Sequence, residues 1–204
     1  MRIGVDFDNT IACYDGVFHS VAVERGLIPA SLATDKTSVR DYLRAQRQDS
    51  VFTELQGYVY GPGMRHVGLY PGVADALRGF VAAGHEIRLI SHRTRMPFAG
   101  PSCDLHDWAW RFLAMQRLVG APGAPFEAGT VYFELTREEK VARIAACECA
   151  LFIDDLPEVL ACPGFPGSTR GILFDPEGSY PDGCWQGHRF ERCADWASIR
   201  HLVA

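Results

Sequence analysis

Short apolar runs that end abruptly in acidic or hydroxyl-bearing residues are the feature that most restricts the fold of this chain. The run from Ile3 to Phe7 stops at an acidic turn, and a later run stops at Ser91. Brief apolar runs bounded by turn residues are typical of strands buried on both faces of a sheet. The predicted strands are Ile3 to Phe7, Glu86 to Ile90, Thr130 to Leu135, Ala150 to Ile153 and Gly171 to Phe174.

Segments with helical periodicity separate these runs. Pro71 and Gly72 open one such segment, and Thr136 with Glu139 three residues later forms a capping box at the start of another. Asp195 is placed to cap a last helix that runs to Val203. Strands that alternate with helices predict an α/β fold, a three-layer sandwich in which helices cover both faces of a parallel, Rossmann-like sheet.

The stretch from about residue 15 to residue 68 interrupts this alternation. It holds three segments with helical spacing, residues 16–25, a second that Ser38 is able to cap, and residues 51–60. We therefore predict a catalytic core of residues 1–14 and 69–204, with residues 15–68 inserted as a small helical cap. Inserts at the ligand edge of a sheet usually serve function. The alternative is a helical excursion that packs on the core.

The polar residues that follow three of the strands should meet at one edge of the sheet, since parallel strands bind ligands beyond their carboxyl ends. The first strand ends in Asp6-Phe7-Asp8, Ser91 follows the second strand, and Asp154 and Asp155 follow the fourth. Magnesium prefers hard oxygen ligands of this kind. An ionised aspartate next to such a cation is able to attack a phosphate ester without a base to activate it.

Each residue of this cluster has a role in that reaction. Asp6 would be nucleophile and metal ligand, and Asp8 would donate a proton to the leaving oxygen and then take one from water. Ser91 would hydrogen-bond the phosphate, and the ammonium of Lys140 would lie against the phosphate and Asp6. Asp154 and Asp155 would supply the remaining charge of the metal site. Asn9, Thr10, His92 and Arg93 are the further candidates to bind substrate.

Less specific explanations exist for the same residues. Acids after a strand suit turns and helix caps, and lysines on helices are normally solvated. Arg137 and Arg143 are nearby substitutes for Lys140, and the cationic row Arg40, Arg44 and Arg47 of the insert also suits a solvated helix face. A zinc site among Cys162, Cys184, His188 and Cys193 has no recognisable finger spacing.

The ordered set of motifs resembles the haloacid dehalogenase (HAD) superfamily of aspartate-nucleophile phosphatases. The motifs are Asp6-Phe7-Asp8-Asn9-Thr10, Ser91, Lys140 and Phe152-Ile153-Asp154-Asp155, in the order of that family, and the core that they frame covers most of the chain. The resemblance implies that the backbone carbonyl of Asp8 binds magnesium. It also implies that Asp155 is a direct ligand, that Asp154 acts through water, and that a small cap of the C1 type follows the first strand.

We therefore expect a magnesium-dependent phosphomonoester hydrolase that acts through an aspartyl-phosphate intermediate. Its expected substrate is a small phosphorylated metabolite, with a nucleotide or sugar phosphate as the first candidate. A phosphotransferase or phosphomutase would keep every motif. Dehalogenases of the superfamily are expected to lack the second aspartate, here Asp8. A non-catalytic binding protein that retains the fold is the rival from another class, and the intact motifs argue against it.

Composition limits the partners and the compartment. The formal net charge is -5, which gives no attraction to nucleic acid or to an anionic membrane. No apolar run approaches the length of a membrane span and no leader is visible. The 7 cysteines lack framework spacing, so we expect reduced thiols and a cytoplasmic location.

Overall fold

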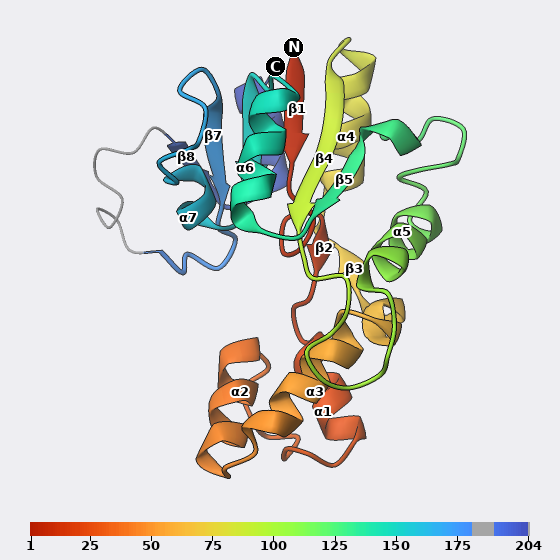
Figure 1. Ribbon diagram of the computed structural model, residues 1–204, viewed down its shortest axis with the longest axis vertical. Helices are drawn as coiled ribbons and strands as arrows, with labels where there is room; N and C mark the ends of the chain where they lie inside the picture. The colour runs from red at the N-terminus through yellow and green to blue at the C-terminus, as the bar shows by residue number, and fades with distance from the viewer. Residues whose placement is uncertain (181–189, 204) are drawn as a thin grey trace. The chain divides into compact units, whose positions relative to one another are not determined.

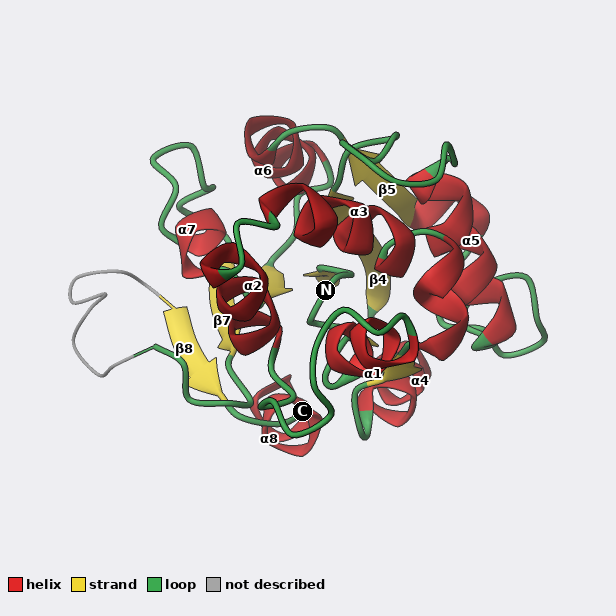
Figure 2. Cartoon of the chain, turned by 90° about the horizontal axis from the view of Figure 1, so that it is seen from below, coloured by secondary structure: helices red, strands yellow, loops and turns green. Residues whose placement is uncertain are grey.

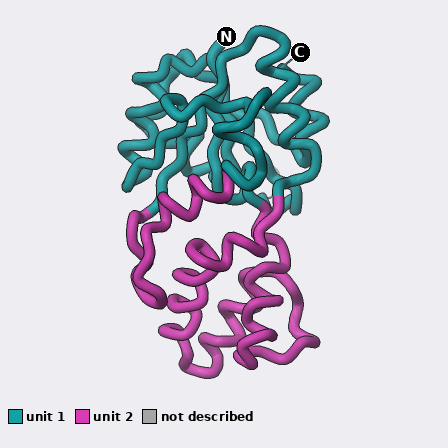
Figure 3. Tube along the Cα trace, turned by 90° about the vertical axis from the view of Figure 1, so that its right-hand side faces the viewer, with its two compact units in different colours: residues 1–12, 69–93, 114–204 teal, residues 13–68, 94–113 magenta. Residues whose placement is uncertain are grey.

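A computed structural model describes residues 1–180 and 190–203 and divides the chain into two compact units, which Figure 3 colours separately. The first unit contains residues 1–12, 69–93 and 114–204, and the second contains residues 13–68 and 94–113. Each unit has its own core, and the residues of the predicted site lie in the first.

A six-stranded parallel sheet forms the centre of the first unit (Figure 1). Its strand order is β5-β4-β1-β6-β7-β8, so β1 lies between β4 and β6. The predicted parallel sheet is thereby confirmed. The strands are β1 (Arg2–Val5), β4 (Glu86–His92), β5 (Val131–Glu134), β6 (Leu151–Asp154), β7 (Arg170–Phe174) and β8 (Phe190–Cys193).

Helices cover both faces of this sheet, as predicted for a three-layer sandwich. Figure 2 shows α6 (Arg137–Ala146) and α7 (Pro157–Leu160) on one face, and α4 (Val73–Ala82) and α8 (Trp196–Val203) on the other. The predicted caps are present at two of these helices. The Thr136 hydroxyl accepts from the backbone N–H of Glu139 and the Glu139 carboxylate accepts from that of Thr136, while Asp195 accepts from the N–H of Ser198.

One strand, β8, was not predicted from the sequence. It pairs with β7 at the edge of the sheet, and its central residues Glu191 and Arg192 are exposed. A strand with polar residues at its centre gives no apolar run, so periodicity alone does not reveal it.

Gly4 of β1 leaves room for a buried aromatic ring under α6, that of Phe152. A Cβ atom at Gly4 would lie 2.4 Å from Cδ2 of Phe152 and 3.0 Å from Sγ of Cys149. The Phe152 ring is fully buried in a cluster with Val141 and Ile144 of α6. The missing side chain at Gly4 therefore sets the position of the Phe152 ring, over which the ammonium of Lys140 lies 5.5 Å from the ring centroid.

Replacing Gly4 by alanine is expected to lower the free energy of unfolding by about 1–3 kcal/mol, because the added methyl group overpacks a buried ring. Gly129→Ala is the matched control, since no atom beyond its chain neighbours lies within 4 Å of the position that its methyl group would take, and its φ is not positive. Its effect should stay within about 0.5 kcal/mol. Chemical denaturation measures both. Equal stability of Gly4→Ala and the unchanged protein would contradict this packing.

The second unit is helical. It is built from α1 (Val17–Glu24), α2 (Lys36–Ala45), α3 (Asp49–Val59), the short 3₁₀ helix η1 (Pro62–His66) and most of α5 (Leu105–Met115). The two-stranded sheet of β2 (Ala12–Cys13) and β3 (Gly68–Leu69) stands where the chain leaves the first unit and returns to it. The cap of α2 is Asp35 and not the predicted Ser38, since the Asp35 carboxylate accepts from the backbone N–H and the hydroxyl of Ser38.

The segment 94–113 groups with the insert, whereas the sequence had assigned it to the core. The reason is a close approach to α3. A Cβ atom at Gly57 would lie 2.1 Å from the carbonyl oxygen of Ala99, and one at Gly61 would lie 2.7 Å from Sγ of Cys103. Glycines at these two positions therefore allow the segment to pack directly on the end of α3. Their contacts join residues about 42 positions apart, which a local pattern does not reveal.

Among the described residues, no helix combines the length and the apolar character that a membrane span requires. The cysteines that the structure describes form no disulfide bond with one another. Cys184 and His188, two members of the alternative zinc set, lie outside the described residues.

Candidate active site

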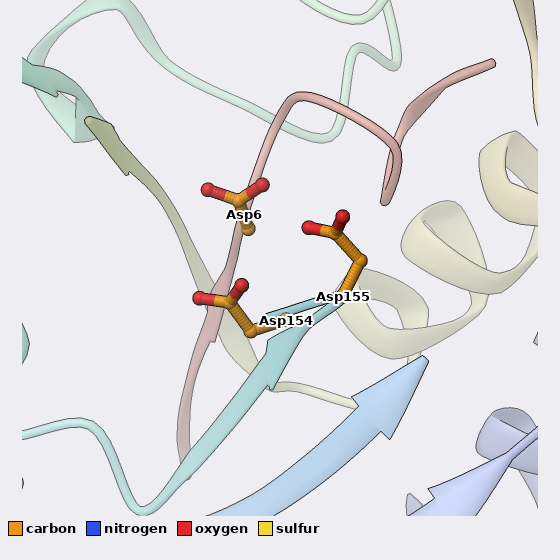
Figure 4. Close-up of side chains that lie close together, drawn as sticks. All are labelled: Asp6, Asp154 and Asp155. Carbon is orange, nitrogen blue, oxygen red and sulfur yellow. The ribbon is translucent and has the colours of Figure 1, made fainter. Parts of the chain in front are cut away.

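Three carboxylates gather at the carboxyl ends of two adjacent strands. Asp6 directly follows β1, Asp154 is the last residue of β6, and Asp155 follows it. The two strands are paired with Val5 opposite Ile153, and the backbone N–H of Asp6 donates to the carbonyl of Ile153 over 2.9 Å. One oxygen from each carboxylate lies within 4.8 Å of the other two, and Figure 4 shows the three side chains close together. The predicted convergence is therefore present in the structure.

Lys140 brings a positive charge to this cluster. Its Nζ lies 2.5 Å from Oδ1 of Asp6 and 2.6 Å from Oδ2 of Asp154, and its side chain is fully buried. The capping box at Thr136 fixes the start of α6, and the backbone N–H of Lys140 donates to the Thr136 carbonyl. Lys140 thus lies one turn inside the helix. Among the cationic side chains of α6, Lys140 is the one that contacts Asp6 and Asp154.

The two arginines considered as substitutes point elsewhere. Nε of Arg143 lies 2.6 Å from Oε1 of Glu134, and its guanidinium lies over the ring of Tyr132. Arg137 lies 3.5 Å from Glu138, and both side chains are exposed. Lys140, and neither of these arginines, therefore contacts Asp6 and Asp154.

The charges of the cluster shift the pKa values of its members. Burial alone would lower the pKa of the Lys140 ammonium, but the charges of Asp154 and Asp6 outweigh burial and hold that pKa above its usual value. Burial raises the pKa of Asp154 in spite of the opposing Lys140 charge. Burial, followed by repulsion from Asp6 and Asp154, raises the pKa of Asp155 well above its usual value. One ammonium is thus too little positive charge for three carboxylates.

The donor set of this cluster fits a hard divalent cation. Carboxylate oxygens from two strand ends, within a few ångströms of one another, are what magnesium or a similar ion binds. A second positive centre would also favour the ionised forms of Asp154 and Asp155. The geometry therefore supports a metal site at Asp6, Asp154 and Asp155.

The loop after Asp6 places the rest of the first motif. Asn9 has a φ of 54°, in the left-handed region that asparagine tolerates better than most residues. The side chain of Asp8 is partly exposed, and its Oδ1 lies 3.7 Å from Nη1 of the nearly buried Arg93. The hydroxyl of Thr10 donates to Oδ1 of Asp155 over 3.4 Å. Thr10 therefore links the first motif to the last.

Trp196 of α8 supports this loop, and sequence reasoning did not find it. Its indole Nε1 donates to the backbone carbonyl of Thr10 over 3.1 Å, and the side chain is almost fully buried. The contact joins the last helix to the first motif across 186 positions. A tryptophan in an apolar helix face gives no local signal for such a role, because its pattern is that of an ordinary core residue.

Ser91 and His92 occupy the end of β4, the strand next to β1. Ser91 is buried and paired with Phe133 of β5. His92 is half-buried, and burial followed by the positive charge of Lys140 lowers its pKa below the usual value. Its ring is therefore mostly neutral at neutral pH. The structure brings both residues to the edge that holds the carboxylates, as the sequence predicted for strand ends.

The cationic row of the insert is largely paired with acids. Nε of Arg40 lies 2.8 Å from Oδ1 of Asp41, and Nε of Arg44 lies 3.1 Å from Oδ1 of Asp49. These contacts lie on the surface and agree with the solvated-face interpretation of α2.

No protein-family model matches the chain, and no curated protein is detectably similar to it in sequence. Solved structures of HAD hydrolases do match it over nearly its whole length. A "predicted phosphatase" of Clostridium acetobutylicum superposes with a TM-score of 0.59 at 14% identity, covering 99% of this chain and 97% of that one. A "putative HAD-hydrolase" of Bacillus subtilis described as bound to magnesium gives a TM-score of 0.56 at 10% identity, covering 99% of this chain and 97% of that one.

A dehalogenase solved with an intermediate complex gives a TM-score of 0.59 at 11% identity and covers 100% of this chain and 96% of its own. Phosphatases and dehalogenases thus share the arrangement of elements described above. Identities this low carry information on the fold and not on the reaction. The resemblance found in the motifs is confirmed at the level of the fold: this chain has the fold of the haloacid dehalogenase superfamily of hydrolases.

Proposed function

We propose that this protein is a magnesium-dependent phosphomonoester hydrolase that acts through an aspartyl-phosphate on Asp6. One observation carries the proposal: the buried ammonium of Lys140 contacts both Asp6 and Asp154, and a carboxylate oxygen of Asp155 lies within 4.8 Å of an oxygen of each. This arrangement joins a nucleophilic carboxylate, a fixed cation and a set of metal ligands at one sheet edge. A phosphate dianion needs the positive charge of a fixed cation and of a metal ion to approach an anionic nucleophile.

Each residue has a defined part in the proposed reaction. The Asp6 carboxylate attacks phosphorus, and the alcohol leaves with a proton from Asp8. Asp8 then removes a proton from the water that hydrolyses the aspartyl-phosphate. Lys140 holds the Asp6 carboxylate and offsets charge on the phosphoryl oxygens, to which Ser91 donates a hydrogen bond. The chemistry that a bound magnesium ion supplies is charge neutralisation between the phosphate and the carboxylates.

Asp8 distinguishes this proposal from the dehalogenase alternative. Halide leaves without a proton, so a dehalogenase has no use for a second acid two residues after its nucleophile. Here the second acid is present, partly exposed and within 3.7 Å of Arg93. We further propose that the helical insert acts as a cap that restricts the substrate to a small phosphorylated metabolite, such as a nucleotide or sugar phosphate.

The direct test is the hydrolysis of p-nitrophenyl phosphate with and without magnesium. We expect turnover that needs magnesium, stops with EDTA and is absent from Asp6→Asn. Release of chloride from 2-chloropropionate without any phosphatase activity would instead favour a dehalogenase. Phosphate transfer to an added alcohol in place of water would identify a phosphotransferase.

Magnesium is also expected to stabilise the fold, and more strongly as pH rises. Without metal, the raised pKa values of Asp154 and Asp155 favour their protonated forms in the folded protein. The contribution of these groups to stability is therefore greatest at or below the usual Asp pKa of about 4, and it falls as pH rises through the raised values. Magnesium offsets the cost of ionising them.

Magnesium at about a hundredfold above its Kd should add about 2.7 kcal/mol to the free energy of unfolding, or about 5–10 °C to Tm. Differential scanning fluorimetry should show a larger shift at about pH 8 than at about pH 5. In Asp155→Asn most of this shift should disappear. A shift that is the same at both pH values and in Asp155→Asn would contradict a magnesium site at these carboxylates.

A further inference from the structure

A groove with a volume of about 480 Å³ opens at the same edge of the sheet as the carboxylates. Three chain segments line it, and each is continuous with a residue of the proposed site. His92 follows Ser91, the first turn of α6 precedes Lys140, and the start of α7 follows Asp155. The groove thus adjoins the place where the proposed reaction holds the phosphate. The organic part of a phosphate ester needs such a space beside its phosphoryl group.

The walls of the groove offer apolar contact. Leu135 is 55% exposed although it is a large hydrophobic residue, and Leu156 lies across the groove at the start of α7. Exposed leucine at a groove wall is a surface that an organic ligand is able to cover. His92 adds a polar ring that is mostly neutral at neutral pH, because burial and the charge of Lys140 lower its pKa.

The charge of the groove is negative. Arg137 and Glu138 lie 3.5 Å apart and largely cancel each other. Glu158, the second residue of α7, is exposed and makes no ion pair with any residue that the structure describes. With a neutral His92, the lining residues that the structure describes carry one uncompensated negative charge. A ligand with a second anionic group is repelled by Glu158, whereas a neutral or cationic ligand is not.

We propose that this groove binds the alcohol part of the substrate, and that Glu158 selects phosphomonoesters whose alcohol part is uncharged or cationic over those with a second anionic group. The inference rests on the proposed phosphatase activity and adds a substrate class to it. Glu158 acts as a specificity-determining residue, with no role in the bond-breaking step. The apolar wall at Leu135 and Leu156 supplies contact area for the body of the ligand.

Three phosphate esters of similar size test this selection: ethanolamine phosphate, glycerol phosphate and phosphoglycolate. Their alcohol parts are cationic, neutral and anionic at neutral pH. The unchanged protein with magnesium, at low ionic strength, should show a kcat/KM for phosphoglycolate about threefold or more below that for glycerol phosphate, as one like charge roughly 7 Å away predicts. Ethanolamine phosphate should equal or exceed glycerol phosphate.

Two lining variants should shift this ratio in opposite directions. Glu158→Gln removes the uncompensated charge, so phosphoglycolate should approach glycerol phosphate. Arg137→Gln leaves Glu138 unbalanced, so the discrimination against phosphoglycolate should increase by about threefold or more. Glu127→Gln is the matched control. Glu127 is exposed and precedes the amino end of β5, whereas the groove lies at the carboxyl ends of the strands. It should leave the ratio unchanged.

The outcomes separate this inference from the proposed function. Turnover of p-nitrophenyl phosphate without any preference among the three esters would overturn the groove assignment alone. An equal effect of Glu158→Gln and Glu127→Gln would overturn it as well. If none of the four phosphate esters is hydrolysed in the presence of magnesium, the proposed function is overturned, and the groove assignment with it.

Discussion

Replacing Lys140 by methionine is expected to lower kcat by about a hundredfold or more, the effect of losing one preorganised charge-stabilising donor. The ammonium is fully buried and lies 2.5 Å from Asp6 and 2.6 Å from Asp154. Methionine keeps much of the side-chain length over the Phe152 ring but removes the charge. Asp6 then loses the cation that orients it, and the phosphoryl oxygens lose its charge.

The same substitution should lower the stability of the metal-free protein at neutral pH. Removing one partner of a buried ion pair typically costs about 3–5 kcal/mol, because the remaining charge stays buried. Burial raises the pKa of Asp154, and the positive charge of Lys140 opposes that rise. Lys140→Met removes this opposing charge. Chemical denaturation with and without magnesium separates this loss from the effect on kcat.

Arg143→Met is the matched control for Lys140→Met. It removes a cation from the same helix, but one that contacts Glu134 and the ring of Tyr132 and not the carboxylate cluster. We expect its kcat for p-nitrophenyl phosphate to stay within about threefold of the unchanged protein. Near-native activity of Lys140→Met, or an equal loss in Arg143→Met, would show that Lys140 does not have the role assigned to it.

Replacing Asp8 by asparagine should separate the two aspartates of the first motif. The nucleophile Asp6 and the backbone carbonyl of residue 8 remain, but the proton donor is lost. An alkyl phosphate, whose alkoxide needs a proton to leave, should be hydrolysed at least about a hundredfold more slowly. Nitrophenolate leaves readily without a proton, so the first step with p-nitrophenyl phosphate should suffer much less.

The second step should then become limiting in Asp8→Asn. Water attack on the aspartyl-phosphate lacks its base, so the phosphoenzyme should accumulate. A rapid-quench measurement of protein-bound phosphate over time detects this accumulation. Asp8→Asn protein whose phosphoenzyme is hydrolysed as fast as that of the unchanged protein would overturn the assignment of Asp8 as the base.

The sequence predicted the parts of the fold in which a local pattern is strong. β1, β4 and β6 are short apolar runs that end in polar residues, and the capping box at Thr136 marks the start of α6. β8 escaped prediction because Glu191 and Arg192 interrupt its apolar pattern. The packing of residues 94–113 on α3 depends on glycines that allow close backbone approach, and this dependence appears only in three dimensions.

The same distinction holds for the site. The meeting of Asp6 with Asp154 and Asp155 could be predicted, because strands of a parallel sheet present their carboxyl ends at one edge. The choice of Lys140 over Arg137 followed from motif order, and the structure adds its physical reason, namely burial between two carboxylates. The indole of Trp196 on the Thr10 carbonyl is a contact between distant parts of the chain. No periodicity in the sequence indicates it.

Asp6 should carry the phosphoryl group during turnover, and rapid-quench labelling of the protein tests this most directly. The protein is mixed with magnesium and ³²P-labelled p-nitrophenyl phosphate, quenched in acid within milliseconds, and examined for acid-stable, hydroxylamine-labile label. Peptide mapping after borohydride reduction then locates the modified residue. We predict label on Asp6 in the unchanged protein, more label in Asp8→Asn and none in Asp6→Asn. Label retained by Asp6→Asn, or rapid hydrolysis of the ester by Asp6→Asn, would contradict the account.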